Sequence, residues 1–98
     1  MGKDRVFLIT GGQAHIGAAA MAYSIESRVK VDSLTVPEHR EETLARDLAR
    51  WAYAEIGQTV CVLIGIHFDY VTKSDIDRII EVVYHEMKQE LARIHGYV

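Results

Sequence analysis

The stretch "LITGGQAHIGAAAMAY" (Leu8–Tyr23) joins two regular patterns through a short glycine-rich segment. The run Arg5–Thr10 is short, rich in β-branched residues and closed by Gly11 and Gly12, which predicts a buried strand. From Gly17 to Ile25, larger and smaller side chains alternate with a period of two. That period favours a second strand, although alanine is also a strong helix former. The small side of this strand would admit a helix or a second subunit at close range.

The middle of the chain predicts a third strand and a helix. Val29–Val36 is expected to pair with the second strand as a hairpin. Apolar residues then recur every four positions up to Ile56, which is typical of one face of an amphipathic helix, and Gly57 ends it. Thr35 and Glu38 have the spacing of a capping box, so this helix is expected to begin beside them.

The last third of the chain predicts a fourth strand and a second helix. Thr59–Ile66 is the most hydrophobic run, which predicts a central strand buried on both faces. Ser74 and Asp77 offer another capping box, and apolar residues spaced three and four apart continue until Gly96. The predicted order is β-β-β-α-β-α. It indicates an α/β protein, in the sense of an α+β sandwich with one mixed sheet and helices packed on it.

Length, charge and composition exclude several classes of function. The 98 residues are expected to form a single domain, 1–98. A net charge of −3 without a basic cluster argues against nucleic acid as a partner. No apolar run approaches the ~18 residues of a membrane span. The only cysteine, Cys61, is expected to be buried and inert, which suits a reducing cytoplasm.

The glycine-rich segment has two interpretations. Gly12 and Gly17 have the separation of a P-loop, but Ala18 and Ala19 replace the lysine and hydroxyl residue that would hold a triphosphate and magnesium. Nucleotide hydrolysis is therefore not expected. The segment is either a backbone nest for a single phosphate or carboxylate, or a tight turn that uses glycine for its backbone angles.

Two histidines stand where ligands commonly bind. His15 lies in the glycine-rich segment, and His67 with Asp69 follows the predicted central strand. Such a His-x-Asp pair could orient an imidazole, supply a general base or contribute a metal ligand. A structural zinc site would want about four ligands, so metal binding is only weakly indicated. Acidic residues such as Glu41 and Glu42 are expected on solvated helix surfaces.

The segments "ITGGQAHIGAAAMAY" and "GIHFDYVTKSDIDRII" together resemble the prenylated flavin chaperone LpdD-like family, whose fold is related to that of proteasome assembly chaperones. The resemblance covers almost all of the chain. It implies a non-enzymatic protein that binds prenylated FMN, FMN or a related flavin phosphate and helps a UbiD-like decarboxylase to mature. It also implies a phosphate-side loop shaped by Gly11, Gly12, His15 and Gly17, with His67 and Asp69 contacting the ligand or bracing that loop.

The sequence leaves three hypotheses about the function of this protein. The favoured one is a cytoplasmic ligand-binding accessory protein that forms a homo-oligomer. The second is an assembly chaperone that binds another protein and no small molecule. The third is a small oligomeric enzyme that uses His67 and Asp69 on a carboxylate or phosphate metabolite.

Overall fold

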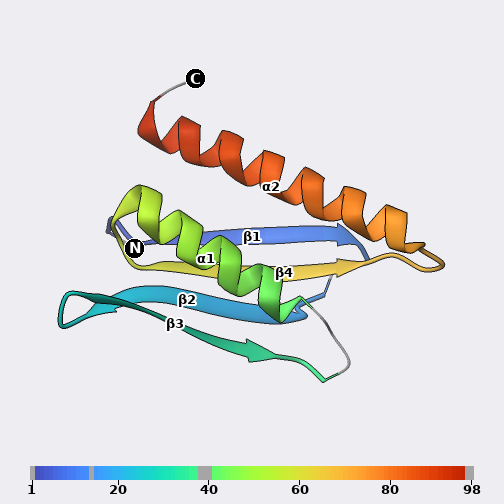
Figure 1. Cartoon of the computed structure of the whole chain (residues 1–98), viewed down its shortest axis with the longest axis horizontal. Coiled ribbons are helices and arrows are strands. Elements are labelled where there is room, and N and C mark those ends of the chain that lie inside the picture. The colour runs from blue at the N-terminus through green and yellow to red at the C-terminus, as the bar shows by residue number, and fades with distance from the viewer. Residues whose placement is uncertain (1, 14, 38–40, 97–98) are drawn as a thin grey trace. The chain divides into compact units, whose positions relative to one another are not determined.

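A computed structural model describes residues 2–13, 15–37 and 41–96. Its elements are β1 (Arg5–Gly12), β2 (Ala18–Ile25), β3 (Arg28–Thr35), α1 (Glu42–Ile56), β4 (Val60–His67) and α2 (Lys73–His95) (Figure 1). The predicted class and order are confirmed, with one mixed four-stranded sheet and two helices. The chain divides into two units, Met1–His67 and Phe68–Val98. A single domain over 1–98 stays a prediction.

The strand order β1-β4-β2-β3 places β4 inside the sheet. β4 runs parallel to β1 and antiparallel to β2, and β2 pairs with β3 as the predicted hairpin. Glu26 and Ser27 turn that hairpin with φ of 51° and 67°, as a type I′ turn requires. Because β1 and β2 lie on either side of β4, the segment that joins them must cross the end of β4. That crossing creates the candidate site.

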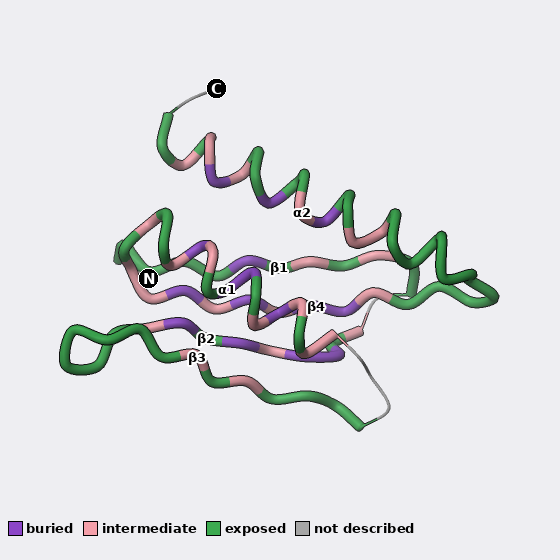
Figure 2. The backbone as a smooth tube through the Cα atoms, viewed as in Figure 1, coloured by how far each residue is buried: buried purple, intermediate pink, exposed green. Residues whose placement is uncertain are grey.

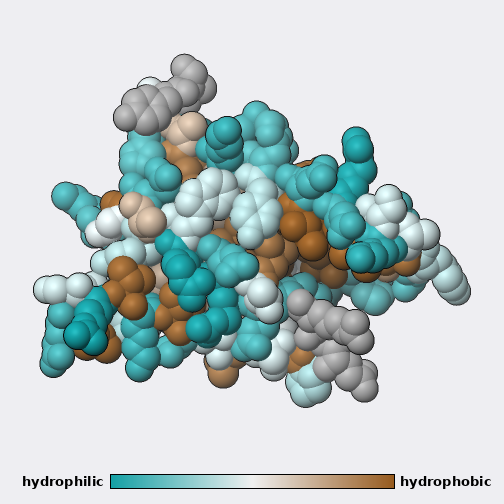
Figure 3. Space-filling model, viewed as in Figure 1, coloured by the Kyte–Doolittle hydropathy of each residue, from teal (hydrophilic) through white to brown (hydrophobic). Residues whose placement is uncertain are grey.

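Helix α1 covers one face of the sheet over β2, β3 and β4. Ala18, Ala20 and Ala22 are at most 1% exposed there, and their short side chains let the helix approach closely, as expected for the small side of β2. Leu48 is the largest α1 side chain that is fully buried. Figure 2 shows buried residues on α1 and on the strands that it covers. In the space-filling view, hydrophilic residues are mixed with less polar ones over α1 (Figure 3).

β4 is buried on one face only, which corrects the prediction for this strand. Val60, Val62 and Ile64 point toward α1 and are 0% exposed. Cys61 and Leu63 point to the opposite face and stay partly exposed, because α1 covers a single face of the sheet. The expectation of a buried Cys61 is therefore wrong, although partial burial still raises the pKa of its thiol.

Helix α1 begins several residues after the capping box predicted for it. Thr35 is the last residue of β3 and pairs with Ala18, and the Val36 N–H donates to the Gly17 carbonyl oxygen at 2.8 Å. These hydrogen bonds keep the backbone extended where a helix was expected to begin. Glu38 lies outside the described residues.

Helix α2 has a capping box, two residues before the expected Ser74–Asp77 pair. The Thr72 hydroxyl accepts from the Asp75 N–H at 3.1 Å, and the Asp75 carboxylate accepts from the Thr72 N–H at 3.0 Å. Gly57 and Gly96 end α1 and α2 as predicted, with φ of 72° and 83°. As far as the chain is described, neither helix is long and apolar enough to cross a bilayer.

The Thr72 cap gives a pH-dependent prediction. Its hydrogen bonds lower the pKa of Asp75 below the usual 3.8. Ionised Asp75 thus contributes stability that is present above the unfolded pKa and is lost as the pH falls through the lowered folded value. We expect Asp75→Asn to destabilise the protein at neutral pH, with the difference from wild type shrinking below about pH 4. Urea unfolding at several pH values, with Asp77→Asn as the control, measures it; a difference that does not change with pH would contradict this assignment.

Candidate functional site

The segment between β1 and β2 is tied to the end of β4 on both sides. The Gln13 N–H donates to the His67 carbonyl oxygen at 2.9 Å, and the Gly17 N–H donates to the Ile64 carbonyl oxygen at 2.8 Å. Between these points the chain passes directly over Gly65. A Cβ on Gly65 would collide with the backbone carbonyl of His15. The absence of a side chain at Gly65 therefore fixes where the crossing segment lies.

Gly12 and Gly17 have different structural roles. Gly12 ends β1 with a φ of 67°, in the left-handed region that favours glycine. Gly17 instead leaves space, because a Cβ there would collide with the Glu41 carboxylate. The segment thus turns at Gly12 and makes room for the Glu41 carboxylate at Gly17.

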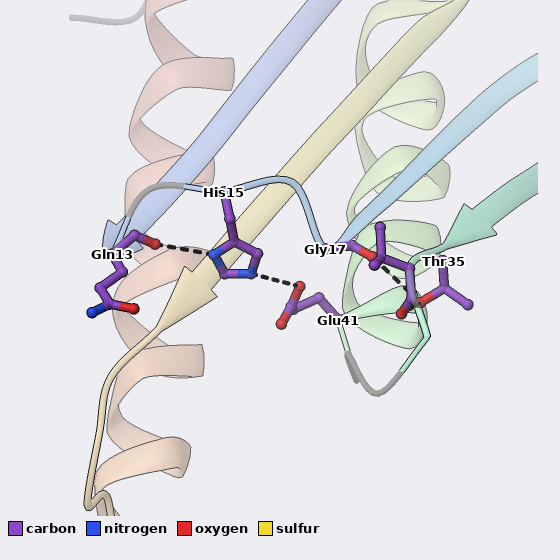
Figure 4. Close-up of polar contacts among 6 residues, drawn as sticks. Gln13, His15, Gly17, Thr35 and Glu41 are labelled. Atoms are coloured by element: carbon purple, nitrogen blue, oxygen red, sulfur yellow. Dashed lines mark hydrogen bonds and ion pairs between the residues drawn. The ribbon is translucent and has the colours of Figure 1, made fainter.

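His15 lies between a carbonyl and a carboxylate (Figure 4). Its Nδ1 donates to the Gln13 carbonyl oxygen at 3.0 Å. Its Nε2 lies 3.7 Å from Oε2 of Glu41, and these two side chains are 22% and 17% exposed. With Nδ1 donating to Gln13, Nε2 is the ring nitrogen that faces the Glu41 carboxylate.

His67 lies next to His15. The centroid of its ring lies 6.0 Å from that of His15, with the two rings nearly perpendicular at 84°. His67 is the last residue of β4 and is exposed. We call His15, Gly17, Glu41 and His67 the anion cradle. It lies at the carboxyl ends of the parallel strands β1 and β4, where α/β proteins commonly bind ligands.

Most of the predicted site residues lie together in the first unit. Gly11 and Gly12 pair with Ile66 and His67 at the ends of β1 and β4, and His15, Gly17 and His67 form the cradle. Asp69 belongs to the second unit.

Glu41 is the residue that sequence reasoning missed. It was expected on a helix surface, but it precedes α1 and its carboxylate is mostly buried beside His15. The hydroxyl of Thr35 and the N–H of Val36 both donate to the Gly17 carbonyl oxygen, at 3.4 Å and 2.8 Å, which holds the end of β3 next to the cradle. No local pattern signals this approach, because Glu41 is distant in sequence from His15.

The described residues contain no group of three or more His, Cys, Asp or Glu side chains arranged to hold a metal ion. The polar side chains that the cradle brings together are the His15 imidazole and the Glu41 carboxylate, and Gly17 leaves the space that the carboxylate oxygen fills.

The family model of the prenylated flavin chaperone LpdD-like domain matches residues 1–95. The chain belongs to this family. A comparison with curated proteins finds no match. The matched residues of this LpdD-like chain span both units and include the whole cradle, and the family's description connects the chain with prenylated flavin and with a chaperone role.

Proposed function

We propose that this LpdD-like chain binds prenylated FMN, or FMN, through its phosphate group at the anion cradle and delivers it, without catalysing a reaction, to a UbiD-like decarboxylase. The observation that carries the proposal is the Glu41 carboxylate, which already lies beside His15 Nε2 in the space left by Gly17. A phosphate that displaced this carboxylate would take the position it now holds beside His15.

The chemistry of a flavin phosphate fits these residues. A phosphate monoester presents strong acceptor oxygens and negative charge, and it binds best to charged donors and backbone N–H groups. The His15 ring can donate through Nε2, and the His67 ring lies beside it, 6.0 Å away between centroids. Glycine at 12 and 17 keeps side chains away from the ligand. The family's association with prenylated flavin supports a flavin ring system as the remainder of the ligand.

A bound phosphate has to displace the Glu41 carboxylate, which predicts the effect of Glu41→Gln. Removing the competing negative charge is expected to tighten FMN binding by about threefold to tenfold, because two like charges this close repel by ~1 kcal/mol or more. Isothermal titration calorimetry measures the change. Glu42→Gln is the matched control, since Glu42 is the next residue and accepts from the Ser33 hydroxyl at 2.8 Å instead. Weaker binding in Glu41→Gln would show that a ligand does not take the place of this carboxylate.

A thermal-shift titration tests the proposed ligand class. We expect FMN and prenylated FMN to raise the melting temperature more than riboflavin does, because binding to the folded state alone stabilises it and riboflavin lacks the phosphate. Inorganic phosphate should give a smaller shift. If none of the four changes the melting temperature of folded protein, the ligand-binding proposal is wrong.

The delivery step has a separate test. A UbiD-type decarboxylase without cofactor, mixed with prenylated FMN, should regain activity faster in the presence of this chain. Loss of that effect in His15→Ala would support delivery through the cradle. An unchanged effect in His15→Ala would favour the second function, a chaperone that acts on the protein and binds no small molecule.

A further inference from the structure

Strand β3 carries two hydroxyl side chains on the side that faces α1. Ser33 pairs with Ala20 and Thr35 pairs with Ala18, and both alanines are buried on that side of the sheet. Because side chains alternate along a strand, the Ser33 and Thr35 hydroxyls stand on the same side. Each hydroxyl makes hydrogen bonds outside the sheet, and these lead to two different parts of the anion cradle.

Ser33 holds the first turn of α1. Its hydroxyl donates to Oε2 of Glu42 at 2.8 Å and accepts from Nη1 of Arg46 at 2.9 Å. Glu42 and Arg46 are four residues apart on α1, so they share one face of the helix and lie on either side of the hydroxyl. All three residues are half-buried, and a charged partner makes such hydrogen bonds stronger than neutral ones. We call Ser33, Glu42 and Arg46 the Ser33 anchor.

Glu41 belongs to the turn that this anchor holds. Its carbonyl oxygen accepts from the Ala45 N–H at 2.9 Å, and its φ of −85° and ψ of −1° continue the helix backward by one residue. Its carboxylate points to His15 rather than capping the helix (Figure 4). A shift of the first turn of α1 therefore moves this carboxylate with it.

Thr35 holds the other side of the same space. Its hydroxyl and the Val36 N–H donate to the Gly17 carbonyl oxygen (Figure 4). Strand β3 thus fixes Gly17 through Thr35, and it fixes the turn that carries Glu41 through Ser33, two residues earlier. One strand therefore sets both the space at Gly17 and the carboxylate that fills it.

We propose that the Ser33 anchor is a positioning device that keeps the Glu41 carboxylate in the cradle and so sets how strongly it competes with a flavin phosphate. The proposal rests on the proposed function for its ligand and adds a means of regulating that site. Without the anchor, the first turn of α1 moves more freely and the carboxylate leaves the cradle more easily. A phosphate then meets weaker competition for the same position.

A double-mutant cycle, measured by FMN titration calorimetry, tests this coupling. Ser33→Ala should tighten FMN binding by about threefold, the scale set by losing one hydrogen bond that favours the competing carboxylate. In the Glu41→Gln background the same substitution should change the affinity by less than about twofold, because the competing charge is already gone. Ser33→Thr keeps the hydroxyl and should bind FMN like the wild type.

Two further substitutions are controls. Ser24→Ala removes a hydroxyl from β2 beside the hairpin turn, at the other end of the strand from Ala18, and should leave the affinity unchanged. Glu42→Gln keeps an oxygen that can accept from Ser33, so it preserves the anchor. A purely structural role for Ser33 would instead weaken FMN binding in Ser33→Ala, and by the same factor in both backgrounds.

An NMR measurement without ligand separates this proposal from the proposed function. In the ligand-free protein, the ring resonances of His15 should move in Ser33→Ala in the same direction as in Glu41→Gln, and should stay in place in Ser33→Thr. Unmoved His15 resonances in Ser33→Ala, or an equal change in FMN affinity in both backgrounds, would overturn the proposal. If the His15 resonances move as expected but no variant binds FMN, the anchor positions Glu41 as proposed and the flavin-binding function is wrong.

Discussion

Gly65→Ala is expected to destabilise the protein by about 3 kcal/mol, at the upper end of the range for overpacking. The added Cβ would collide with the backbone carbonyl of His15, and a backbone atom cannot move aside as the end of a flexible side chain can. The crossing segment is also held at both ends by hydrogen bonds from Gln13 and Gly17 to β4. Relief of the collision would have to break at least one of these bonds. The cradle would be displaced with it, so FMN binding should weaken in the same variant.

Gly57→Ala is the control for this substitution. A Cβ on Gly57 would meet open space, and its φ of 72° is the only source of strain, so the expected loss is about 1 kcal/mol. Urea unfolding of both variants gives the comparison. A Gly65→Ala protein that is no less stable than Gly57→Ala would mean that the segment does not cross β4 at this residue.

His15→Ala is expected to weaken FMN binding by roughly tenfold to a hundredfold, the usual effect of losing one charge-assisted hydrogen bond to an anion. The affinity for riboflavin should change little, because riboflavin lacks the phosphate. His15 reaches the phosphate position through its Nε2, since its Nδ1 donates to Gln13. Isothermal titration calorimetry with both ligands separates the phosphate contribution from that of the ring.

Arg28→Ala provides the matched control for the charge. Arg28 is exposed and begins β3 at the hairpin with β2, at the other end of the sheet from the cradle (Figure 1). Its loss removes a positive charge without touching the site, so the affinity for FMN should stay within about twofold of wild type when salt screens the long-range field. Equal losses in the two variants would indicate nonspecific attraction, and no loss in His15→Ala would remove His15 from the site.

The order of the elements is readable from local patterns, but the starts of the helices are not. The periodicity of the apolar residues was sufficient to predict whether each element is a strand or a helix, and Gly57 and Gly96 were sufficient to predict where the two helices end. The capping-box spacing, however, occurs at Thr35 and Glu38, at Ser74 and Asp77 and at Thr72 and Asp75. Of the two pairs that the structure describes in full, only Thr72 and Asp75 form a capping box. Which pair forms the capping box depends on whether the backbone before it is already hydrogen-bonded in the sheet. For Thr35, pairing with β2 extends the strand and prevents the helix.

The glycines and histidines of the candidate site were predictable from the sequence, because they lie next to the ends of predicted strands. Glu41 was not, because its approach to His15 depends on β2 and β3 returning beside β4 before α1 begins. The structural reason for Gly65 was equally hidden. It arises from a chain crossing that only the order β1-β4-β2 reveals. The partial exposure of β4 follows from the same topology, since α1 covers only one face.

A titration of isotope-labelled protein with FMN, followed by amide NMR, tests the central claim most directly. Binding at the cradle predicts that the amides of Gly12, Gln13, Gly17 and His67 shift with stoichiometric saturation, and that riboflavin moves them far less. Amides at the cradle that stay unmoved while FMN binds, or shifts confined to the sheet face around Met21 and Leu34, would contradict a phosphate site at His15.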